Sequence, residues 1–502
     1  MEKFMLALQI MFTPLSLSYV LIGVCVGIIG GALPGISTVM TLALMLPMTY
    51  TMDPAMAVMT LGAITVGSTY GGSISAALLN VPGTPASAAT ALEGYPMTAN
   101  GQAKTAVGLG AVASFFGSII GIILLVTVTP LMVKLAMLFS PWEYFWFAMF
   151  GLIICANLSR GNFLKGIIAA VVGILLSQVG MDTICADRRF TFGQTWLLDG
   201  FPLIPVMIGL YGMAEVMTNM INVNATAAKI QGGTLFPFKM VLENFPLVLR
   251  VSLLGFVIGV IPGVGANIAS WVGYDHAKST GKFPELFGHG SIEGMIGSEA
   301  ANNACVPGAY APLLALGIPG DNGTAMILGA LIIYGVTPGP TFLMNQGHWL
   351  YMIAISMLIA TIVFVLVGAG IGRIFIHALV LPQPIIMTVV STLCVIGAYS
   401  VSKNPVHVYM MFAFGIIGVF MRRQGFPIAP FILGMVLGRD IIDTNFRRAM
   451  LAGDLSLVPF FTRPVSAVLL IIILFMIGSE LLKKIKNRSA KNNEEPKEEQ
   501  PV

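Results

Sequence analysis

Polar side chains lie beside Pro-Gly pairs that interrupt several apolar segments of this 502-residue chain. Proline removes a backbone donor and glycine adds conformational freedom, so each pair is predicted to end or kink a helix. The N–H groups at the start of the following half-helix carry partial positive charge, which suits a bound carboxylate. No Lys or Arg lies in residues 30–92 or 251–277, so an anion could be held there without a buried cation.

These positions form the predicted substrate site. Lipid cannot satisfy the backbone groups that a break exposes, so such breaks survive only where they line a cavity or are buried in protein. The alternative is that Gly, Pro, Ser and Asn serve close packing and kinks of membrane helices. The predicted substrate-binding residues are Pro34, Gly35, Ser37, Asn80, Pro82, Gly83, Thr84, Pro262, Gly263, Asn267, Asn302, Asn303, Pro319, Gly320, Asn322 and Thr324.

Two acidic residues are candidates for coupling transport to an ion. Glu299, in GSEAANNA, is expected between loop and membrane, where an ionisable group is costly and suggests function. It could carry a proton, help to bind a cation, or cap a helix at the interface. Asp321 follows a break and could ligate a cation or cap a half-helix. Glu93 is expected to be structural.

Other chemistry finds little support in the sequence. Five cysteines and five histidines are widely scattered, which gives no disulfide framework and no zinc site. No paired acid, base or nucleophile stands out, so we expect no enzyme, no catalytic residue and no cofactor other than a coupling ion, Na⁺ or H⁺. The net charge of +4 gives no case for nucleic acid.

Composition places the chain in lipid. Hydrophobic residues make up 56% of it, charged residues only 10%, and the mean hydropathy is +0.89. Residues 465–482 carry one charge, Glu480, and are long enough to cross a hydrocarbon core of about 30 Å. We predict an all-α polytopic membrane protein with about 10–12 transmembrane helices, one of them over residues 307–334.

The Pro-Gly pairs recur in the same order in two halves. Pro34 and Pro82 are separated by 48 residues (82 − 34), and Pro262 and Pro319 by 57 (319 − 262). We predict a first repeat over 1–230, a second over 231–482, each with Pro-Gly-broken helices or re-entrant hairpins, and a disordered charged tail over 483–502. Interrupted segments at matching positions point to the binding site of a secondary transporter. The repeats could be parallel or inverted, and we favour inverted.

The chain ends indicate orientation. Lys483, Lys484, Lys486, Arg488 and Lys491 follow the last apolar run directly, which predicts a cytoplasmic C-terminus. The N-terminal apolar run is predicted to be a retained membrane segment, and the alternative is a cleaved signal peptide.

Five stretches carry a resemblance to a known family: YGGSISAALLNVPGTPASAATALEGYPM (70–97), DRRFTFGQTWLLDGFPLIPVMIGLYGMAEV (187–216), GVIPGVGANIASWVGYDHAK (259–278), FGHGSIEGMIGSEAANNA (287–304) and LGIPGDNGTAMILGALIIYGVTPGP (316–340). They closely resemble the large membrane subunit of tripartite tricarboxylate transporters. The family's characteristic Pro-Gly loops map onto Pro34, Gly35, Pro82, Gly83, Pro262, Gly263, Pro319 and Gly320. One departure is CVPGAYAP after EAANNA, where a more Gly-rich run is expected.

The resemblance implies a permease of the bacterial inner membrane that works with a small membrane subunit and a periplasmic solute-binding protein. Such a permease takes up tricarboxylates or related carboxylates by coupling to an ion gradient, and a homo-oligomer is possible. Our predicted mechanism is alternating access at a midplane site made by the two hairpins. The alternatives are a carboxylate-selective channel, a permease for a non-carboxylate small molecule, and a scaffold subunit.

Overall fold

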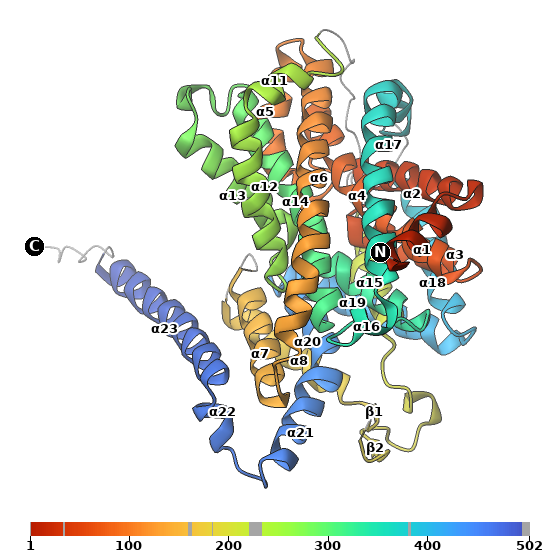
Figure 1. Cartoon of the computed structure of the whole chain (residues 1–502), viewed down its shortest axis with the longest axis vertical. Coiled ribbons are helices and arrows are strands. Elements are labelled where there is room, and N and C mark those ends of the chain that lie inside the picture. The colour runs from red at the N-terminus through yellow and green to blue at the C-terminus, as the bar shows by residue number, and fades with distance from the viewer. Residues whose placement is uncertain are drawn as a thin grey trace, which may run out of the picture.

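A computed structural model describes residues 2–33, 36–158, 163–182, 184–219, 233–379 and 383–493. Helices dominate, and the described strands form one two-stranded hairpin in which Gly180 pairs with Arg189 (Figure 1). The first half contains α1 (Glu2–Met11), α2 (Pro14–Ala32), α3 (Thr38–Thr49), α4 (Pro54–Leu79), η1 (Pro85–Ser87), α5 (Ala88–Ala99), α6 (Ala103–Ala136), α7 (Pro141–Leu158), α8 (Phe163–Ser177), β1 (Gly180–Met181), β2 (Arg188–Arg189), η2 (Thr195–Leu197), α9 (Leu203–Met207), the π-helix η3 (Ile208–Met213) and α10 (Ala214–Asn219).

The second half follows the same plan. It contains α11 (Phe238–Glu243), α12 (Phe245–Val260), α13 (Gly265–Thr280), η4 (Pro284–Leu286), α14 (Ile292–Leu316), α15 (Asn322–Ile333), α16 (Phe342–Gln346), α17 (His348–Leu379), α18 (Gln383–Ser400), α19 (Pro405–Arg423), α20 (Ile428–Leu437), the π-helix η5 (Gly438–Asp443), α21 (Thr444–Ala452), α22 (Val458–Thr462) and α23 (Pro464–Asn493).

The predicted class, an all-α polytopic membrane protein, is confirmed. Among the described residues, four helices are long and apolar enough to cross a membrane: Pro14–Ala32, Ala103–Ala136, His348–Val367 and Pro405–Arg423. Shorter apolar helices accompany them at Thr38–Thr49, Phe163–Ser177, Leu203–Thr218, Phe245–Val260, Asn322–Ile333, Met387–Ser400 and Pro464–Glu480.

Helices α4 and α14 form the centre of the bundle. Every residue from Ala57 to Leu78 and from Gly294 to Leu316 is buried. Small residues let the neighbouring backbones approach closely, as in other membrane helix pairs. A Cβ added at Gly31 of α2 would lie 2.0 Å from the Ser68 carbonyl oxygen, and one at Gly255 of α12 would lie 2.0 Å from that of Ala301. Matching helix pairs, α2 on α4 and α12 on α14, therefore use the same close approach.

The order of elements repeats along the chain. Broken helices α2–α3 and α12–α13 are each followed by a long buried helix, α4 or α14, and then by a second break. The two buried helices run in opposite directions, because Ser73 contacts Glu299 whereas Thr65, earlier in α4, contacts Tyr310, later in α14. Their partners are exchanged between the halves: α4 packs on α17, and α14 packs on α6.

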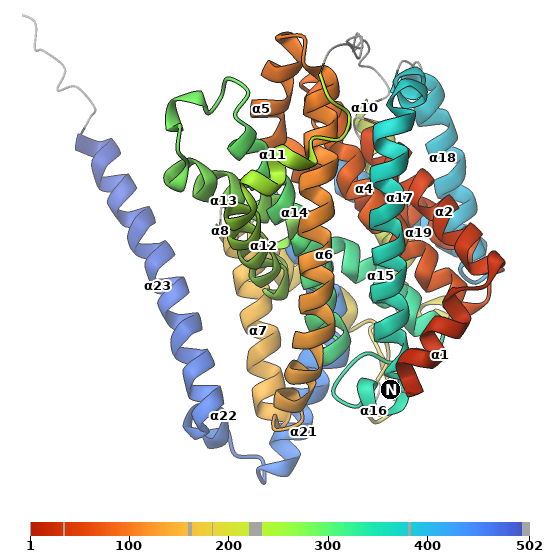
Figure 2. The same ribbon diagram turned by 45° about the horizontal axis from the view of Figure 1, so that its top comes forward.

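The bundle has two distinct ends. Helices α5 and α11 lie at the end drawn uppermost, called here the α5 end, and α16 and α21 lie at the opposite end, called the α21 end (Figures 1 and 2). Helix α6 starts at the α5 end, whereas α17 starts at the α21 end beside α16. Helix α23 starts beside α22 at the α21 end and runs toward the α5 end.

Two sequence predictions need correction. The predicted span over 307–334 is wrong, because α14 already begins at Ile292 and ends at Leu316. The first turns of α14 carry polar residues, so their hydropathy is that of a loop. These turns are nevertheless helical, because they are buried in protein rather than in lipid. Helix α23 also continues to Asn493, so the predicted disordered tail over 483–502 is helical in its first part. Its Lys, Arg and Ala residues are good helix formers. Residues 494–502 lie outside the described residues.

Candidate functional site

The two Pro-Gly breaks of the second half contact each other. The Gly263 amide donates to the Gly320 carbonyl oxygen at 2.8 Å, and the Gly320 amide donates to that of Ala309 at 3.3 Å. Gly263 has φ +80°, a left-handed conformation that favours glycine. Two breaks separated by more than fifty residues of chain are thus one structural unit, as the predicted hairpin required, and Pro262 and Pro319 are buried beside them.

The first half has the matching geometry where the structure describes it. The Gly83 amide donates to the Gly72 carbonyl oxygen at 3.4 Å. A Cβ at Gly83 would lie 2.0 Å from the Gly31 carbonyl oxygen, and one at Gly320 would lie 2.5 Å from the Gly259 carbonyl oxygen. The predicted site residues Pro34 and Gly35 lie outside the described residues.

Several half-helix starts are capped by the chain's own side chains. Ser37 Oγ accepts from the Met40 amide at 3.2 Å and caps α3. Asp321 Oδ1 accepts from the Thr324 amide at 2.7 Å, while Thr324 Oγ1 accepts from the Asp321 amide at 2.9 Å. A carboxylate therefore already occupies the start of α15, where the sequence predicted a substrate carboxylate. Of the two roles predicted for Asp321, the geometry supports capping.

Other predicted residues serve the breaks themselves. Thr84 is buried and precedes η1, where Ser87 Oγ donates to the Thr84 carbonyl oxygen at 2.8 Å. Asn80 is exposed and ends α4 in the left-handed conformation, φ 56°. Pro82 and Asn322 are half-buried at the two second breaks.

Unsatisfied polar atoms gather where α13, α14 and η1 meet. Helix α13 packs against both of the others, and its first turn has no side-chain cap. Asn267 Oδ1 and Ser270 Oγ, both on α13, and Asn303 Oδ1 on α14 are buried without a hydrogen-bond partner. Asn302 Nδ2 reaches across to the Ala86 carbonyl oxygen at 3.2 Å. Buried polar atoms are usually paired, so this region is suited to a polar ligand.

Glu299 is at the centre of a hydroxyl cluster in the middle of the bundle. Its side chain is fully buried, not interfacial as predicted. The carboxylate accepts hydrogen bonds from Ser73 Oγ of α4 at 2.8 Å, from Ser114 Oγ of α6 at 2.7 Å and from Thr90 Oγ1 of α5. Asn303 Nδ2 lies 3.5 Å away. The sequence named Glu299 as a coupling candidate but placed it between loop and membrane, because one glutamate among Gly, Ser, Ala and Asn gives a segment the hydropathy of a loop.

A cavity of about 830 Å³ lies at the α21 end, between α8, α9, α15, α20 and α21. It reaches Leu316 and Gly317, just before the Pro319 break, but none of the predicted substrate-binding residues lines it. Its charged lining residues are Asp199, Arg439, Asp440 and Arg448. The cavity and the predicted site are therefore neighbours rather than one pocket.

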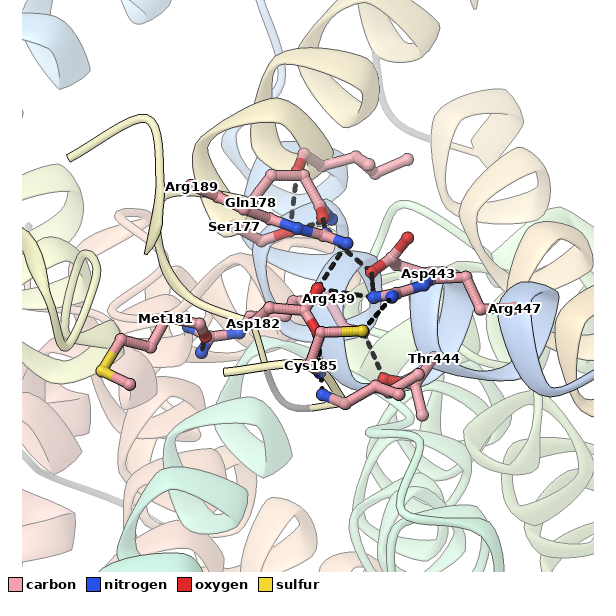
Figure 3. A network of polar contacts seen from close by, with 12 residues as sticks. Ser177, Gln178, Met181, Asp182, Cys185, Arg189, Arg439, Asp443, Thr444 and Arg447 are labelled. Atoms are coloured by element: carbon pink, nitrogen blue, oxygen red, sulfur yellow. Dashed lines mark hydrogen bonds and ion pairs between the residues drawn. The ribbon is translucent and has the colours of Figure 1, made fainter. Parts of the chain in front are cut away.

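Figure 3 shows an ion-pair network that the sequence did not reveal. Ser177 and Arg439, which are drawn there, also line the cavity. Asp182, in the β1–β2 connection, accepts from the Ile184 and Cys185 amides at 2.7 Å each and pairs with Arg189 and Arg447. These amides, Cys185 first, and the two arginines lower the pKa of Asp182 from 3.8 to about 2. The network ties the strand hairpin to α21. The only signal in the sequence was a cluster of acids and arginines, since the pairs that join the hairpin to α21, Asp182–Arg447 and Arg189–Asp443, each span more than 250 residues.

The α5 end is closed by a different carboxylate. Glu93 Oε1 accepts from Tyr274 Oη and the Gly288 amide, each at 2.7 Å. Glu93 Oε2 accepts from the Gly290 amide at 2.9 Å and the Ser291 amide at 2.7 Å. These contacts, called here the Glu93 clamp, join α5 of the first half to α13 and the loop before α14 of the second half. Glu93 thus binds the opposite half, beyond the local structural role expected for it.

Comparison with known proteins shows the family of the chain. The profile of the tripartite tricarboxylate transporter TctA family matches residues 17–433, from α2 into α20. The chain belongs to that family. The match covers all the predicted Pro-Gly breaks, Glu93 and Glu299, whereas Arg439 and Arg448 lie beyond it. The resemblance drawn from the sequence motifs is thereby confirmed.

Two relatives from Agrobacterium vitis share this TctA-family sequence. An "uncharacterized 52.8 kDa protein in TAR-I ttuC' 3'region" is 35% identical over 490 residues, 97% of each chain. An "uncharacterized protein in TAR-II ttuC' 3'region" is 36% identical over 234 residues, 47% of this chain and 96% of the relative. No solved structure matches the chain. TctA is a transporter family, not an enzyme family, and it is a component of a tripartite system, which implies further subunits.

Proposed function

We propose that this TctA-family chain is the permease subunit of a binding-protein-dependent secondary transporter. It imports tricarboxylates or related carboxylates across the bacterial inner membrane, driven by a Na⁺ or H⁺ gradient. Its partners are a small membrane subunit and a periplasmic solute-binding protein. No cofactor other than the coupling ion is required.

The observation that carries the proposal is the relation between the halves. Equivalent helices α4 and α14 run in opposite directions, and each packs against a long helix of the other half. This arrangement supports an inverted repeat, in which the same sequence plan faces the two sides of the membrane in turn. Because α6 of the first half packs on α14, and α17 of the second half packs on α4, a movement of either buried helix must also move a long helix of the other half.

The two ends of the bundle support alternating access. The α5 end is closed by the Glu93 clamp, and the α21 end holds the cavity. We place the C-terminus in the cytoplasm, because basic residues follow α23. Since α23 runs toward the α5 end, the cavity then faces the periplasm, where a binding protein would release its cargo.

Arg448 is the side chain best suited to capture an anion in this cavity. It is exposed and lines the cavity, and it has no ion-pair or hydrogen-bond partner among the described residues. Its neighbour Arg447 is engaged by Asp182, and Arg439 donates to the Met181 carbonyl oxygen. A guanidinium group binds a carboxylate through two parallel hydrogen bonds. The cavity volume of about 830 Å³ accommodates a small polycarboxylate.

Uptake into proteoliposomes tests the proposed function. The chain, its small subunit and its binding protein are reconstituted, and radiolabelled citrate and a panel of other carboxylates are offered under separate Na⁺ and H⁺ gradients. Accumulation against the carboxylate gradient, dependent on the binding protein and on one cation, is expected. Equilibration without accumulation in every condition would support a channel instead.

A further inference from the structure

Glu299 draws its ligands from both halves of the molecule. The carboxylate belongs to α14 of the second half, and the three hydroxyl groups that bind it belong to α4, α5 and α6 of the first half. Ser73, Ser114 and Thr90 are all buried. No solvent reaches the cluster, so its charge must be balanced inside the protein.

No positive side chain balances it on the described part of the chain. The three hydroxyls and the Asn303 amide are neutral, and an ionised carboxylate in such surroundings is strongly disfavoured. Tyr70 of α4 interacts electrostatically with Glu299, and its buried hydroxyl has no hydrogen-bond partner among the described residues. Glu93 of α5 is bound to the opposite half, and residues 105–133 of α6 carry no charge.

The other deeply buried glutamates are compensated. Glu143 binds Arg463 Nε at 2.6 Å and the Ser140 amide at 2.8 Å. Glu93 accepts from three backbone amides, which stabilise a negative charge. Glu299 has neither kind of partner within the described residues, so a cation remains the group that can neutralise it.

The oxygen atoms around Glu299 suit a small cation. Two carboxylate oxygens and three hydroxyl oxygens converge there. The adjacent Asn303, which is 1% exposed, donates through Nδ2 to Ser114 Oγ and has an Oδ1 without a hydrogen-bond partner. Carboxylate, hydroxyl and carbonyl oxygens are the ligands of hard cations. The same carboxylate can instead be neutralised by a proton.

We propose that Glu299, with Ser73, Thr90, Ser114 and Asn303, forms the site of the coupling cation, which is one monovalent cation, Na⁺ or H⁺. The proposal rests on the proposed transport function. It assigns different roles to the two acids predicted for coupling, Glu299 and Asp321. Asp321 is held by Thr324 as a helix cap. Glu299, by contrast, lies where α4, α5, α6 and α14 meet.

This site gives a physical reason for coupling. With its cation bound, Glu299 is neutral and the hydroxyls of α4, α5 and α6 hold α14 in the closed interior. Without the cation the same interior would enclose an uncompensated carboxylate, which disfavours closure. Helices α4 and α14 lead directly into the second breaks of their halves, so the cation state would be transmitted to the hairpins.

A cargo-independent measurement tests the cation site. The thermal unfolding midpoint of the purified full chain is measured with Na⁺ replaced by choline at fixed pH, and with pH varied in the absence of Na⁺. A bound cation stabilises the folded state, so wild type should respond to Na⁺ or to acid, and Glu299→Gln should lose that response. An unchanged response in Glu299→Gln, or no response of wild type to either cation, would overturn the proposal.

Ligand variants identify the cation. Thr90→Val and Ser114→Ala keep the charge and each remove one hydroxyl, so about a tenfold rise in the half-saturating Na⁺ concentration is expected if Na⁺ is bound. If a proton is bound, Na⁺ should have no effect and the acid response should move to higher pH. If Glu299→Gln does not fold, the responses of Thr90→Val and Ser114→Ala to Na⁺ and to pH test the cation site. Wild-type behaviour of both would contradict the proposed ligand set.

Glu143→Gln is the matched control, because it removes a buried carboxylate that has its own arginine partner. It should keep the cation response. In proteoliposomes, Glu299→Gln should retain carboxylate exchange while losing cation-driven accumulation. Absence of exchange in the wild type would contradict the proposed permease function, whereas the thermal measurement would still report on the cation site.

Discussion

The α5 end and the α21 end differ in the contacts that join corresponding elements of the two halves. At the α5 end, Glu93 of the first hairpin accepts four hydrogen bonds from the second half. At the α21 end, the corresponding contact between α15 and α3 includes one hydroxyl pair, Thr49 Oγ1 with Tyr334 Oη, at 2.6 Å. Hydrogen bonds to a charged group contribute about 1.5–3 kcal/mol and neutral ones about 1 kcal/mol.

This inequality accompanies the cavity described at the α21 end, the end with the weaker contact. An inverted repeat alone would give two equivalent ends, so the difference must lie in side chains that the halves do not share. Residue 330, which the repeat offset of 237 (319 − 82) places opposite Glu93, is an alanine. Under the proposed alternating access, such side-chain differences would favour one of the two states.

Both ends depend on the paired breaks, so filling a break should have the largest effect. Gly83→Val and Gly320→Val should each lower carboxylate uptake by about a hundredfold or more, because the new Cβ would lie 2.0 Å or 2.5 Å from a backbone oxygen and force the hairpin to move. Uptake into proteoliposomes, normalised to inserted protein, measures this.

The control is Gly478→Val in α23, where an added Cβ meets no atom within 4 Å. Its uptake should equal that of wild type. Full activity of both break variants would contradict the role assigned to the hairpins.

The α21 end is distinguished by its cavity, and Arg448→Gln tests whether that cavity receives the carboxylate. Loss of one charge-assisted hydrogen-bond donor pair should raise the half-saturating carboxylate concentration about tenfold, with little change in maximal rate. Arg188→Gln is the matched control, since Arg188 is also exposed near this end but does not line the cavity. If the half-saturating carboxylate concentration rises equally in the two variants, Arg448 does not bind the carboxylate specifically.

The α5 end is distinguished by the Glu93 clamp, which Tyr274→Phe weakens by one hydrogen bond. Opening of that end should increase about tenfold. The measurement is the labelling rate of Met97→Cys, a buried position beside Gly290, in a background without the native cysteines. An unchanged rate, together with an unchanged rate in Glu93→Gln, would show that the clamp does not hold this end closed.

A smaller effect, confined to acid, is expected from the network at the cavity edge. The pKa of Asp182 is lowered from 3.8 to about 2, so its ionised form stabilises the folded connection above pH 3.8. That stabilisation should decline as the pH falls from about 4 to 2. Pepsin cleavage between residues 184 and 202 should rise over this range in wild type, and Asp182→Asn should already be cleaved at pH 4. Identical cleavage profiles would contradict the lowered pKa.

Local patterns predicted the parts of this fold that depend on neighbouring residues. The Pro-Gly pairs marked the breaks between helices, and their spacing predicts two halves. The partners of Glu93 and Glu299 on other helices, and the Arg447 partner of Asp182, could not be predicted, because they lie on elements distant in sequence. The bounds of α14 were also predicted wrongly, because a hydropathy analysis assumes that a helix is surrounded by lipid, whereas α14 is surrounded by protein.

The predicted substrate residues divide for a similar reason. Ser, Thr, Asn and Asp side chains at the breaks can either cap a helix or bind a ligand. Only the three-dimensional contacts show which role each residue has. Ser37 and Thr324 are used as caps, as is the ion-coupling candidate Asp321. Asn267 and Asn303 keep unpartnered oxygens in the interior.

Alternate opening of the two ends is the central claim, and thiol labelling of both ends tests it most directly. Leu328→Cys reports on the cavity and Met97→Cys on the α5 end, each in a cysteine-free background. Adding carboxylate, binding protein and coupling cation together should slow labelling at residue 328 and accelerate it at residue 97. Simultaneous acceleration at both positions, or no change at either, would contradict alternating access.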